Sequence, residues 1–196
     1  MMSSSTTKPL AEGQPQANDL SHQHLSDQHL SDKPADAESF TAAVVTVSDS
    51  CAHGERVDIS GPAVVEALRT SGFRVVATKI VQDDSMQIQN VLVHLALEAR
   101  FIATTGGTGI AARDVTPEAT EAICERLIDG VAERMRLAGS KTTPLAALSR
   151  GVCGTRGKTL ILNLPGSPSG AVESLAAVLE LIPHALNLLD GKTQHE

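Results

Sequence analysis

The stretch FIATTGGTGIAARDVTPEAT, residues 101–120, decides the fold class of this protein. Phe101–Thr104 is a short apolar run, typical of a strand that is buried on both faces. Glycines follow it, and Thr116-Pro117-Glu118 then predicts a helix start, with a capping hydroxyl, an early proline and an acid near the positive end of the helix dipole. A buried strand, a glycine-rich loop and a helix in this order indicate a unit of a parallel α/β sheet.

The alternation of strand and helix continues on both sides of this stretch. It predicts an α/β fold of three layers, α/β/α, with a mostly parallel central sheet and right-handed crossovers. The expected strands are Ala43–Val47, Phe73–Val81, Phe101–Thr104, Ser149–Cys153 and Lys158–Leu162, the last two separated by a turn at 154–157. Expected helices begin at Ser60 and at Ser85, where the serine side chain caps, cover Pro117–Ile128 and about Gly130–Leu137, and fill the last segment with an interruption at Pro183.

The N-terminal part differs in composition from the rest of the 196 residues. Residues 1–39 contain no Val, Ile or Phe and cannot bury enough apolar area to offset the entropy of ordering, so we expect a disordered tail. Its three closely spaced histidines, His22, His24 and His29, could bind a metal weakly, but a solvated tail is favoured. Residues 40–196 are expected to form one folded domain.

Composition also limits the partners. A net charge of −7 and only 2% aromatic residues argue against nucleic acid, which needs a basic face and stacking platforms. No apolar run approaches the ~20 residues that span a bilayer, and the N-terminus lacks a secretory pattern, so no membrane association is expected. Cys51, Cys124 and Cys153 are an odd, widely spaced set, which favours a reduced, cytoplasmic setting in which none of them reacts.

Ligands of parallel α/β sheets bind at the carboxyl ends of strands. This rule directs attention to the loops 48–60, 82–85, 105–116 and 163–170. In the third loop, Gly106, Gly107 and Gly109 allow backbone N–H groups to approach a phosphate. The same loop adds further donors at Thr105, Thr108 and Arg113. The alternative is a tight turn that binds nothing. The loose match to a Rossmann fingerprint stands at the wrong strand, and no Walker A sequence is present.

Two aspartates point to a cation beside the phosphate. Asp114 follows the glycines directly, and Asp83, with Asp84, ends the second strand. A carboxylate in a phosphate loop is electrostatically unfavourable unless Mg²⁺ bridges it to phosphate oxygens. The alternatives are support of a helix N-terminus by Asp114 and an ordinary acidic turn at Asp83. Other polar or restricted residues at strand ends that could line the same site are Ser48, Asp49, Asn163, Pro165 and Gly166.

Several longer segments together resemble the molybdopterin adenylyltransferases, which include Mog and MoaB proteins and the G domain of gephyrin. The resemblance covers about residues 42–191. The segments occur in the family's order: TVSDSCAHGERVDISGP, VQDD, TTGGTGIAARDVTPEAT, LSRGVCGTRGKTLILNLPGSPSGAVESL and PHALNLLDG.

This resemblance implies a homotrimer that binds molybdopterin and MgATP and moves AMP from ATP to the terminal phosphate of molybdopterin, releasing pyrophosphate. It implies that Asp83 and Asp114 are the catalytic, metal-holding acids and that Ser149 contacts the pterin. A second pterin-contacting serine of the family aligns with Gly139, and the adjacent Ser140 is expected to substitute. A molybdenum insertase is a possible partner.

Three other readings remain open. The first is a MoaB-like protein that binds molybdopterin without catalysis. The second is a trimeric scaffold, as in gephyrin's structural role, and the third is a CinA-type domain that processes nucleotides. The RDVTPEAT segment and Asp83 favour the catalytic reading.

Overall fold

The computed structural model describes residues 39–192, so the predicted N-terminal tail lies outside the described residues. Within them lies a six-stranded sheet in the order β2-β1-β3-β6-β5-β4. The first four strands in this order are parallel, whereas β5 runs antiparallel to β6 and β4 antiparallel to β5. The strands are β1 (Thr41–Val47), β2 (Arg74–Val81), β3 (Phe101–Thr105), β4 (Arg126–Leu127), β5 (Cys153–Arg156) and β6 (Thr159–Leu164).

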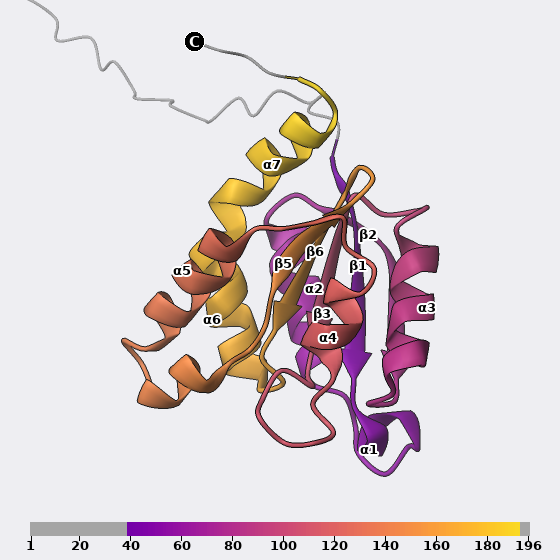
Figure 1. Cartoon of the computed structure of the whole chain (residues 1–196), viewed down its shortest axis with the longest axis vertical. Coiled ribbons are helices and arrows are strands. Elements are labelled where there is room, and N and C mark those ends of the chain that lie inside the picture. The colour runs from indigo at the N-terminus through magenta and orange to yellow at the C-terminus, as the bar shows by residue number, and fades with distance from the viewer. Residues whose placement is uncertain (1–38, 193–196) are drawn as a thin grey trace, which may run out of the picture. The chain divides into compact units, whose positions relative to one another are not determined.

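Helices cover both faces of the sheet, which confirms the predicted three layers (Figure 1). Helices α3 (Ser85–Leu95) and α4 (Thr116–Glu121) pack on one face. The other face carries α2 (Ser60–Thr70), α5 (Asp129–Gly139), α6 (Pro168–Val178) and α7 (Ile182–Leu189). The short elements are α1 (Asp49–Ala52) and the 3₁₀ helices η1 (Pro144–Leu148) and η2 (Leu179–Leu181).

The central strands are apolar on both sides because each side meets a helix layer. In β1, Ala42 and Val44 face the α2 and α6 layer, and Ala43 and Val45 face α3. All four residues are at most 1% exposed. Burial of a large aliphatic side chain contributes about 1.5–3 kcal/mol relative to exposure, so this double layer accounts for the continuous apolar runs in the sequence.

Two sequence-based expectations about element bounds are wrong. The helix expected over Pro117–Ile128 ends at Glu121, because the chain then pairs β4 with β5, and Glu125 N–H donates to Thr155 O at 2.8 Å. The strand expected over Ser149–Cys153 lies later, at β5, so the expected turn at 154–157 falls largely within a strand. Both corrections come from strand pairing between distant residues, which a local apolar pattern does not contain.

Three expected helix caps also differ. The Ser60 side chain does not cap α2, and Gly61 N–H in its first turn donates instead to the Asp58 carboxylate at 3.0 Å. The carboxylate of Asp84, not the hydroxyl of Ser85, caps α3 by accepting a hydrogen bond from Gln87 N–H at 2.8 Å. The Thr116 hydroxyl does not cap α4 and instead donates to Gly106 O at 3.0 Å. Thr116 therefore connects the start of α4 to the glycine-rich loop.

One helical stretch has the length and apolar composition of a membrane span, contrary to the expectation from the sequence. It comprises the 22 residues Pro168–Leu189. The 3₁₀ helix η2 interrupts it, and one face of it lies in the protein core, with Leu175 and Leu186 fully buried. Packing against the sheet is therefore sufficient to explain why this segment is apolar.

Candidate active site

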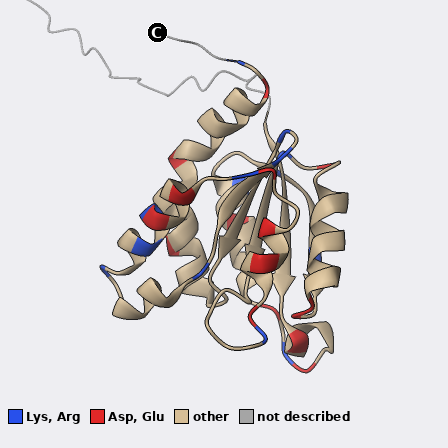
Figure 2. Cartoon of the chain, in the orientation of Figure 1, with Lys and Arg blue, Asp and Glu red and all other residues tan. Residues whose placement is uncertain are grey.

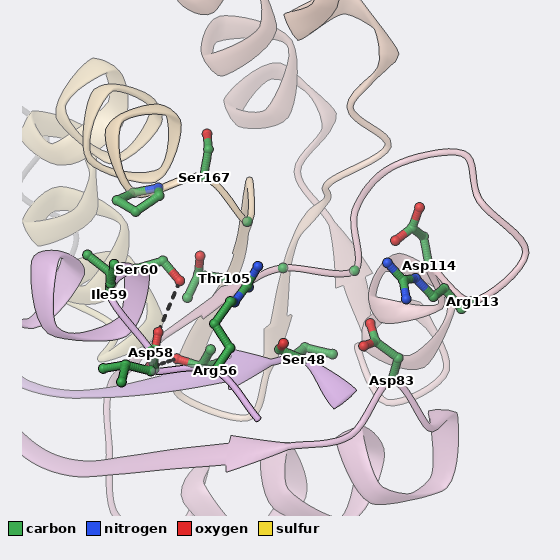
Figure 3. Close-up of a pocket in the computed structure, with 17 residues that line it drawn as sticks. Ser48, Arg56, Asp58, Ile59, Ser60, Asp83, Thr105, Arg113, Asp114 and Ser167 are labelled. Carbon is green, nitrogen blue, oxygen red and sulfur yellow. Dashed lines mark hydrogen bonds between the residues drawn. The ribbon is translucent and has the colours of Figure 1, made fainter. Parts of the chain in front are cut away.

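The parallel strands β2, β1, β3 and β6 all end at one edge of the sheet, and the loops that follow them surround a cavity of about 470 Å³ (Figure 3). Acidic and basic residues both occur along these loops, near α1 (Figure 2). The cavity brings together eight of the residues predicted from the sequence: Ser48, Asp83, Thr105, Gly106, Gly107, Arg113, Asp114 and Gly166.

The glycine-rich loop passes close to its neighbours, and this requires glycine at two positions. Gly106 has a φ of +103°, and a Cβ there would lie 2.2 Å from Val47 O. Gly107 has a φ of +62°, and its Cβ would lie 2.3 Å from the Thr116 hydroxyl and 3.1 Å from Asp83 Oδ1. Side chains at these positions would therefore clash with the end of β1 and with the site itself.

Asp83 is held at the end of β2 by the neighbouring loop. Its Oδ2 accepts a hydrogen bond from Asp49 N–H at 3.0 Å, and its own N–H donates to Asp49 Oδ1 at 3.0 Å. Burial raises the pKa of Asp83, and the charges of Asp49 and Asp114 act in the same direction, whereas the Asp49 N–H and Arg113 oppose the rise. A carboxylate in this setting gains from a nearby cation.

Asp114 comes from the glycine-rich loop after β3, and Figure 3 shows Asp83, Arg113 and Asp114 gathered at one end of the cavity. The Asp114 carboxylate accepts a hydrogen bond from Ala111 N–H at 2.8 Å, which stabilises the loop that carries it. No group of three or more His, Cys, Asp or Glu residues that could hold a metal occurs in residues 39–192. Two carboxylates nevertheless fit Mg²⁺ that arrives with a nucleotide, because Mg²⁺ commonly takes one or two carboxylates and completes its shell with phosphates and water.

A second cavity, of about 490 Å³, adjoins the first. Gly107, Asp114, Gly166 and Ser167 line both cavities and form their common wall. The second cavity is bounded by η1 and α6, with apolar side chains of Leu145 and Leu148 and polar groups of Ser149, Glu173 and Ser174. Ser149, which the resemblance assigns to the pterin, therefore lies across the common wall from Asp83.

The remaining predicted residues are distributed differently. Thr108, Gly109 and Pro165, expected around a phosphate, line the second cavity and not the first. Asp49 lines neither cavity and acts on the site through Asp83.

Asn163 is fully buried and lines neither cavity. Its amide donates to the hydroxyls of Thr104 and Thr120 at 3.0 and 2.9 Å, and its Oδ1 accepts from Val152 N–H at 3.3 Å. Its hydrogen bonds connect β3, β6 and α4, and this internal position disagrees with the predicted contact to a nucleotide.

Ser140 follows α5 on the surface and lines neither cavity, contrary to the predicted pterin contact. Gly139 does line the second cavity, and a Cβ there would lie 2.8 Å from Ala146 Cβ. Close packing of α5 on η1 therefore explains why glycine stands where the resemblance places a serine.

Sequence reasoning missed Arg56 and Ser167, which both line the first cavity. The Arg56 side chain extends toward the middle of the cavity (Figure 3). Its loop is attached to the sheet by Asp58, whose carboxylate accepts hydrogen bonds from the Thr46 hydroxyl at 2.7 Å and from Gly61 N–H at 3.0 Å. The sequence signal that could have identified Arg56 is a positively charged residue within the loop 48–60, which was expected to line the site.

Comparisons with known proteins identify the family of the chain. The chain is 40% identical over 152 residues to a molybdopterin adenylyltransferase of Helicobacter pylori, an alignment that covers 76% of this chain and 86% of that protein. It is 43% identical over 155 residues to the molybdenum cofactor synthesis protein cinnamon of Drosophila melanogaster, covering 78% of this chain but only 26% of that longer protein. The structure of the molybdopterin biosynthesis enzyme MoaB of Thermus thermophilus superposes with a TM-score of 0.74 at 51% identity, covering 80% of this chain and 99% of that one. Residues 43–184 match the family model described as "Probable molybdopterin binding domain", and the chain belongs to this family.

Proposed function

We propose that this protein transfers AMP from ATP to the terminal phosphate of molybdopterin, releases pyrophosphate and requires Mg²⁺. The observation that carries this proposal is the pair of adjoining cavities with Asp114 and Gly107 in their common wall. A group transfer between two bound substrates needs two pockets that meet at the reacting atoms, and this arrangement supplies them.

The first cavity is suited to the triphosphate of ATP. Arg56 and Arg113 supply guanidinium groups, and the backbone of Gly106 and Gly107 can come close to phosphate oxygens. Asp83 and Asp114 would hold Mg²⁺, which when bound neutralises phosphate charge and so favours attack at phosphorus. Phosphoryl chemistry of this kind depends mainly on positioning and charge neutralisation.

The second cavity is suited to a flat, polar ring system with an attached phosphate. Leu145 and Leu148 offer apolar surface to the ring, and Ser149 and Glu173 offer hydrogen-bonding groups to its edge. An oxygen of the acceptor phosphate forms the new bond to the α-phosphorus of ATP, while the bond from that phosphorus to the pyrophosphate oxygen breaks. No side chain needs to act as nucleophile, and burial raises the pKa of the Cys124 and Cys153 thiols to about 11 and about 12.

The test is incubation of the protein with molybdopterin, Mg²⁺ and ATP labelled in the adenosine, followed by chromatography for adenylylated molybdopterin. We expect the labelled product and one equivalent of pyrophosphate. The variant Asp114→Asn should lose turnover and keep molybdopterin binding. Glu133→Gln, an exposed acid on α5 outside both cavities, is the matched control and should behave as wild type.

The outcomes separate the other readings. Binding of molybdopterin without product would support a non-catalytic MoaB-like protein or a gephyrin-like scaffold. Turnover of pyridine or ADP-ribose nucleotides with indifference to molybdopterin would support a CinA-type enzyme. Near-normal transfer by Asp114→Asn would contradict the metal-holding role of this residue.

We also propose that the chain acts as a homotrimer in the cytoplasm and delivers its product to a molybdenum insertase. The trimer rests on the family resemblance, and light scattering of the purified protein tests it. The cytoplasmic setting is supported by free cysteines at Cys51, Cys124 and Cys153. The insertase partner rests on the family resemblance, and the relation to the much longer molybdenum cofactor synthesis protein cinnamon, of which this chain spans 26%, is in line with further steps on the same cofactor.

A further inference from the structure

Arg150 uses its whole guanidinium group to hold the loop that carries Asp114. Its Nε donates to Gly109 O at 2.6 Å, and its Nη2 donates to Asp114 O at 2.5 Å. Its Nη1 forms an ion pair with Glu118 on α4, and its backbone N–H donates to Thr108 O at 2.9 Å. One residue therefore contacts the beginning of the loop, its end and the helix that follows.

Few other contacts hold the loop between Gly109 and Asp114. Its internal hydrogen bonds join Asp114 N–H to Ala111 O at 2.9 Å and Ala111 N–H to the Asp114 carboxylate at 2.8 Å. Ile110, Ala111, Ala112 and Arg113 are not buried. Internal bonds keep the loop's shape but do not fix where it sits, so the attachment to Arg150 determines the position of Asp114 relative to the cavities.

The location of Arg150 in the chain links the two cavities. It directly follows Ser149, which lines the second cavity, whereas Arg150 itself lines neither cavity. The segment that bounds the second cavity is thus attached through Arg150 to the loop that forms the common wall. The hydrogen bond from Arg150 lowers the pKa of the Glu118 carboxyl and so favours the ionised form of Glu118 that the ion pair needs.

We propose that Arg150 is a positioning residue: it holds the loop from Gly109 to Asp114 so that the Asp114 carboxylate stays in the wall between the two cavities. The catalytic consequence rests on the proposed function, since a misplacement of ~1 Å can cost roughly 100-fold in rate. The structural consequence, a loop ordered by one side chain, stands independently of the reaction.

The test compares three variants. Arg150→Gln removes the charge and most of the donors. Arg150→Lys keeps the charge but cannot reach all three acceptors at once. Arg134→Gln is the matched control, because Arg134 makes the same kinds of contact, to Ala177 O at 2.7 Å and to Glu180, on the surface of α5.

The first measurement is amide hydrogen exchange of residues 109–114 without substrates. We expect exchange about 10-fold faster in Arg150→Gln, an intermediate value in Arg150→Lys and the wild-type value in Arg134→Gln. The second measurement is kinetics. We expect kcat to fall about 10- to 100-fold in Arg150→Gln with little change in the KM for ATP, a higher Mg²⁺ concentration for half-maximal rate, and partial recovery in Arg150→Lys.

Unchanged exchange in Arg150→Gln would overturn the proposal. Faster exchange with wild-type kcat would also overturn it, because the arginine would then serve only stability. If Arg150→Gln does not fold, Arg150→Lys takes its place in both measurements, together with Glu118→Gln, which removes the negative charge of the ion pair and keeps a weaker, neutral acceptor. If the wild-type protein shows no adenylyl transfer, the proposed function fails, and the exchange data alone decide whether Arg150 orders the loop.

Discussion

Asp49 and Asp83 exchange a reciprocal pair of hydrogen bonds, each donating its backbone N–H to the other's carboxylate at 3.0 Å. The pair joins the start of α1 to the segment that follows β2. The loop after β1 therefore orients the acid that follows the neighbouring strand β2. Asp49 lines neither cavity, yet it determines how the Asp83 carboxylate is presented.

Substitution Asp49→Ala should therefore affect both stability and activity. It removes the acceptor of Asp83 N–H and releases the Asp83 backbone, so we expect the free energy of unfolding to fall by about 1–3 kcal/mol. We expect kcat/KM to fall about 10-fold, because Asp83 keeps the hydrogen bond from the residue 49 N–H to its carboxylate but loses the one that fixes its backbone. Denaturant melts and steady-state kinetics measure the two effects.

The control for Asp49 is Asp84→Ala, which removes the cap of α3 beside the site. It should cost about 0.5–2 kcal/mol of stability but leave kcat/KM within about twofold of wild type. Equal loss of kcat/KM in both variants would mean that the activity follows general stability and not the contact with Asp83.

Arg56 should contribute to ATP binding. Its side chain extends into the first cavity and can pair with phosphate oxygens (Figure 3). We expect Arg56→Ala to raise the KM for ATP about 10-fold with kcat nearly unchanged, the pattern of an interaction equally strong in ground and transition states. Arg69→Ala, on α2 outside both cavities, should leave the KM unchanged. If Arg56→Ala kept the wild-type KM for ATP, Arg56 would not contribute to ATP binding.

Asn163 should contribute to stability and not to substrate binding. Asn163→Ala leaves the hydroxyls of Thr104 and Thr120 and the N–H of Val152 without their partner inside the protein, so we expect a loss of about 3 kcal/mol in the free energy of unfolding. The KM for ATP of the folded fraction should stay at the wild-type value. Asn90→Ala, at an exposed position on α3, should change stability by less than about 0.5 kcal/mol. A raised KM with unchanged stability would restore the nucleotide contact predicted from the sequence.

Asp190 should make stability depend on pH. Arg100 donates a hydrogen bond to its Oδ2 at 2.8 Å and lowers the pKa of its carboxyl, and Lys158 lies 3.3 Å from its Oδ1. Because the pKa of Asp190 is lower in the folded than in the unfolded chain, its stabilisation is fully present above the ordinary aspartate value. This stabilisation is lost as the pH falls through the lowered pKa that Asp190 has in the folded chain.

The measurement is the difference in free energy of unfolding between wild type and Asp190→Asn as a function of pH. We expect this difference to be largest near neutral pH and to shrink on acidification. Glu133→Gln, an exposed acid with no ion pair among the described residues, should show no such trend. A difference that is constant from neutral to acidic pH would rule out the lowered pKa as its cause.

Local sequence patterns were sufficient for the class of fold and for the edge of the sheet that carries the site. Apolar runs identify β1 and β3, because a strand covered by helices on both faces must be apolar along its length. The edge strand β2 is identified by its β-branched residues, although none of its residues is fully buried. Asp83 and Asp114 could be placed near each other because parallel strands bring their carboxyl ends to one edge. Both inferences need only residues next to one another in the chain and a general rule of sheet geometry.

Tertiary contacts decided the rest, because they join residues that no local pattern relates. The pairing of β4 with β5 ends α4 earlier than its helical spacing predicts, and the hydrogen bonds of Asn163 direct a polar side chain into the core. The separation into two cavities with a common wall depends on where η1 and α6 pack. The sequence by itself determined β1, β2, β3 and β6, the loops that follow them and the acids in those loops, whose signals are local. Only the folded chain, by bringing Arg150 to Gly109 and Asp114, decided how one of those acids is held.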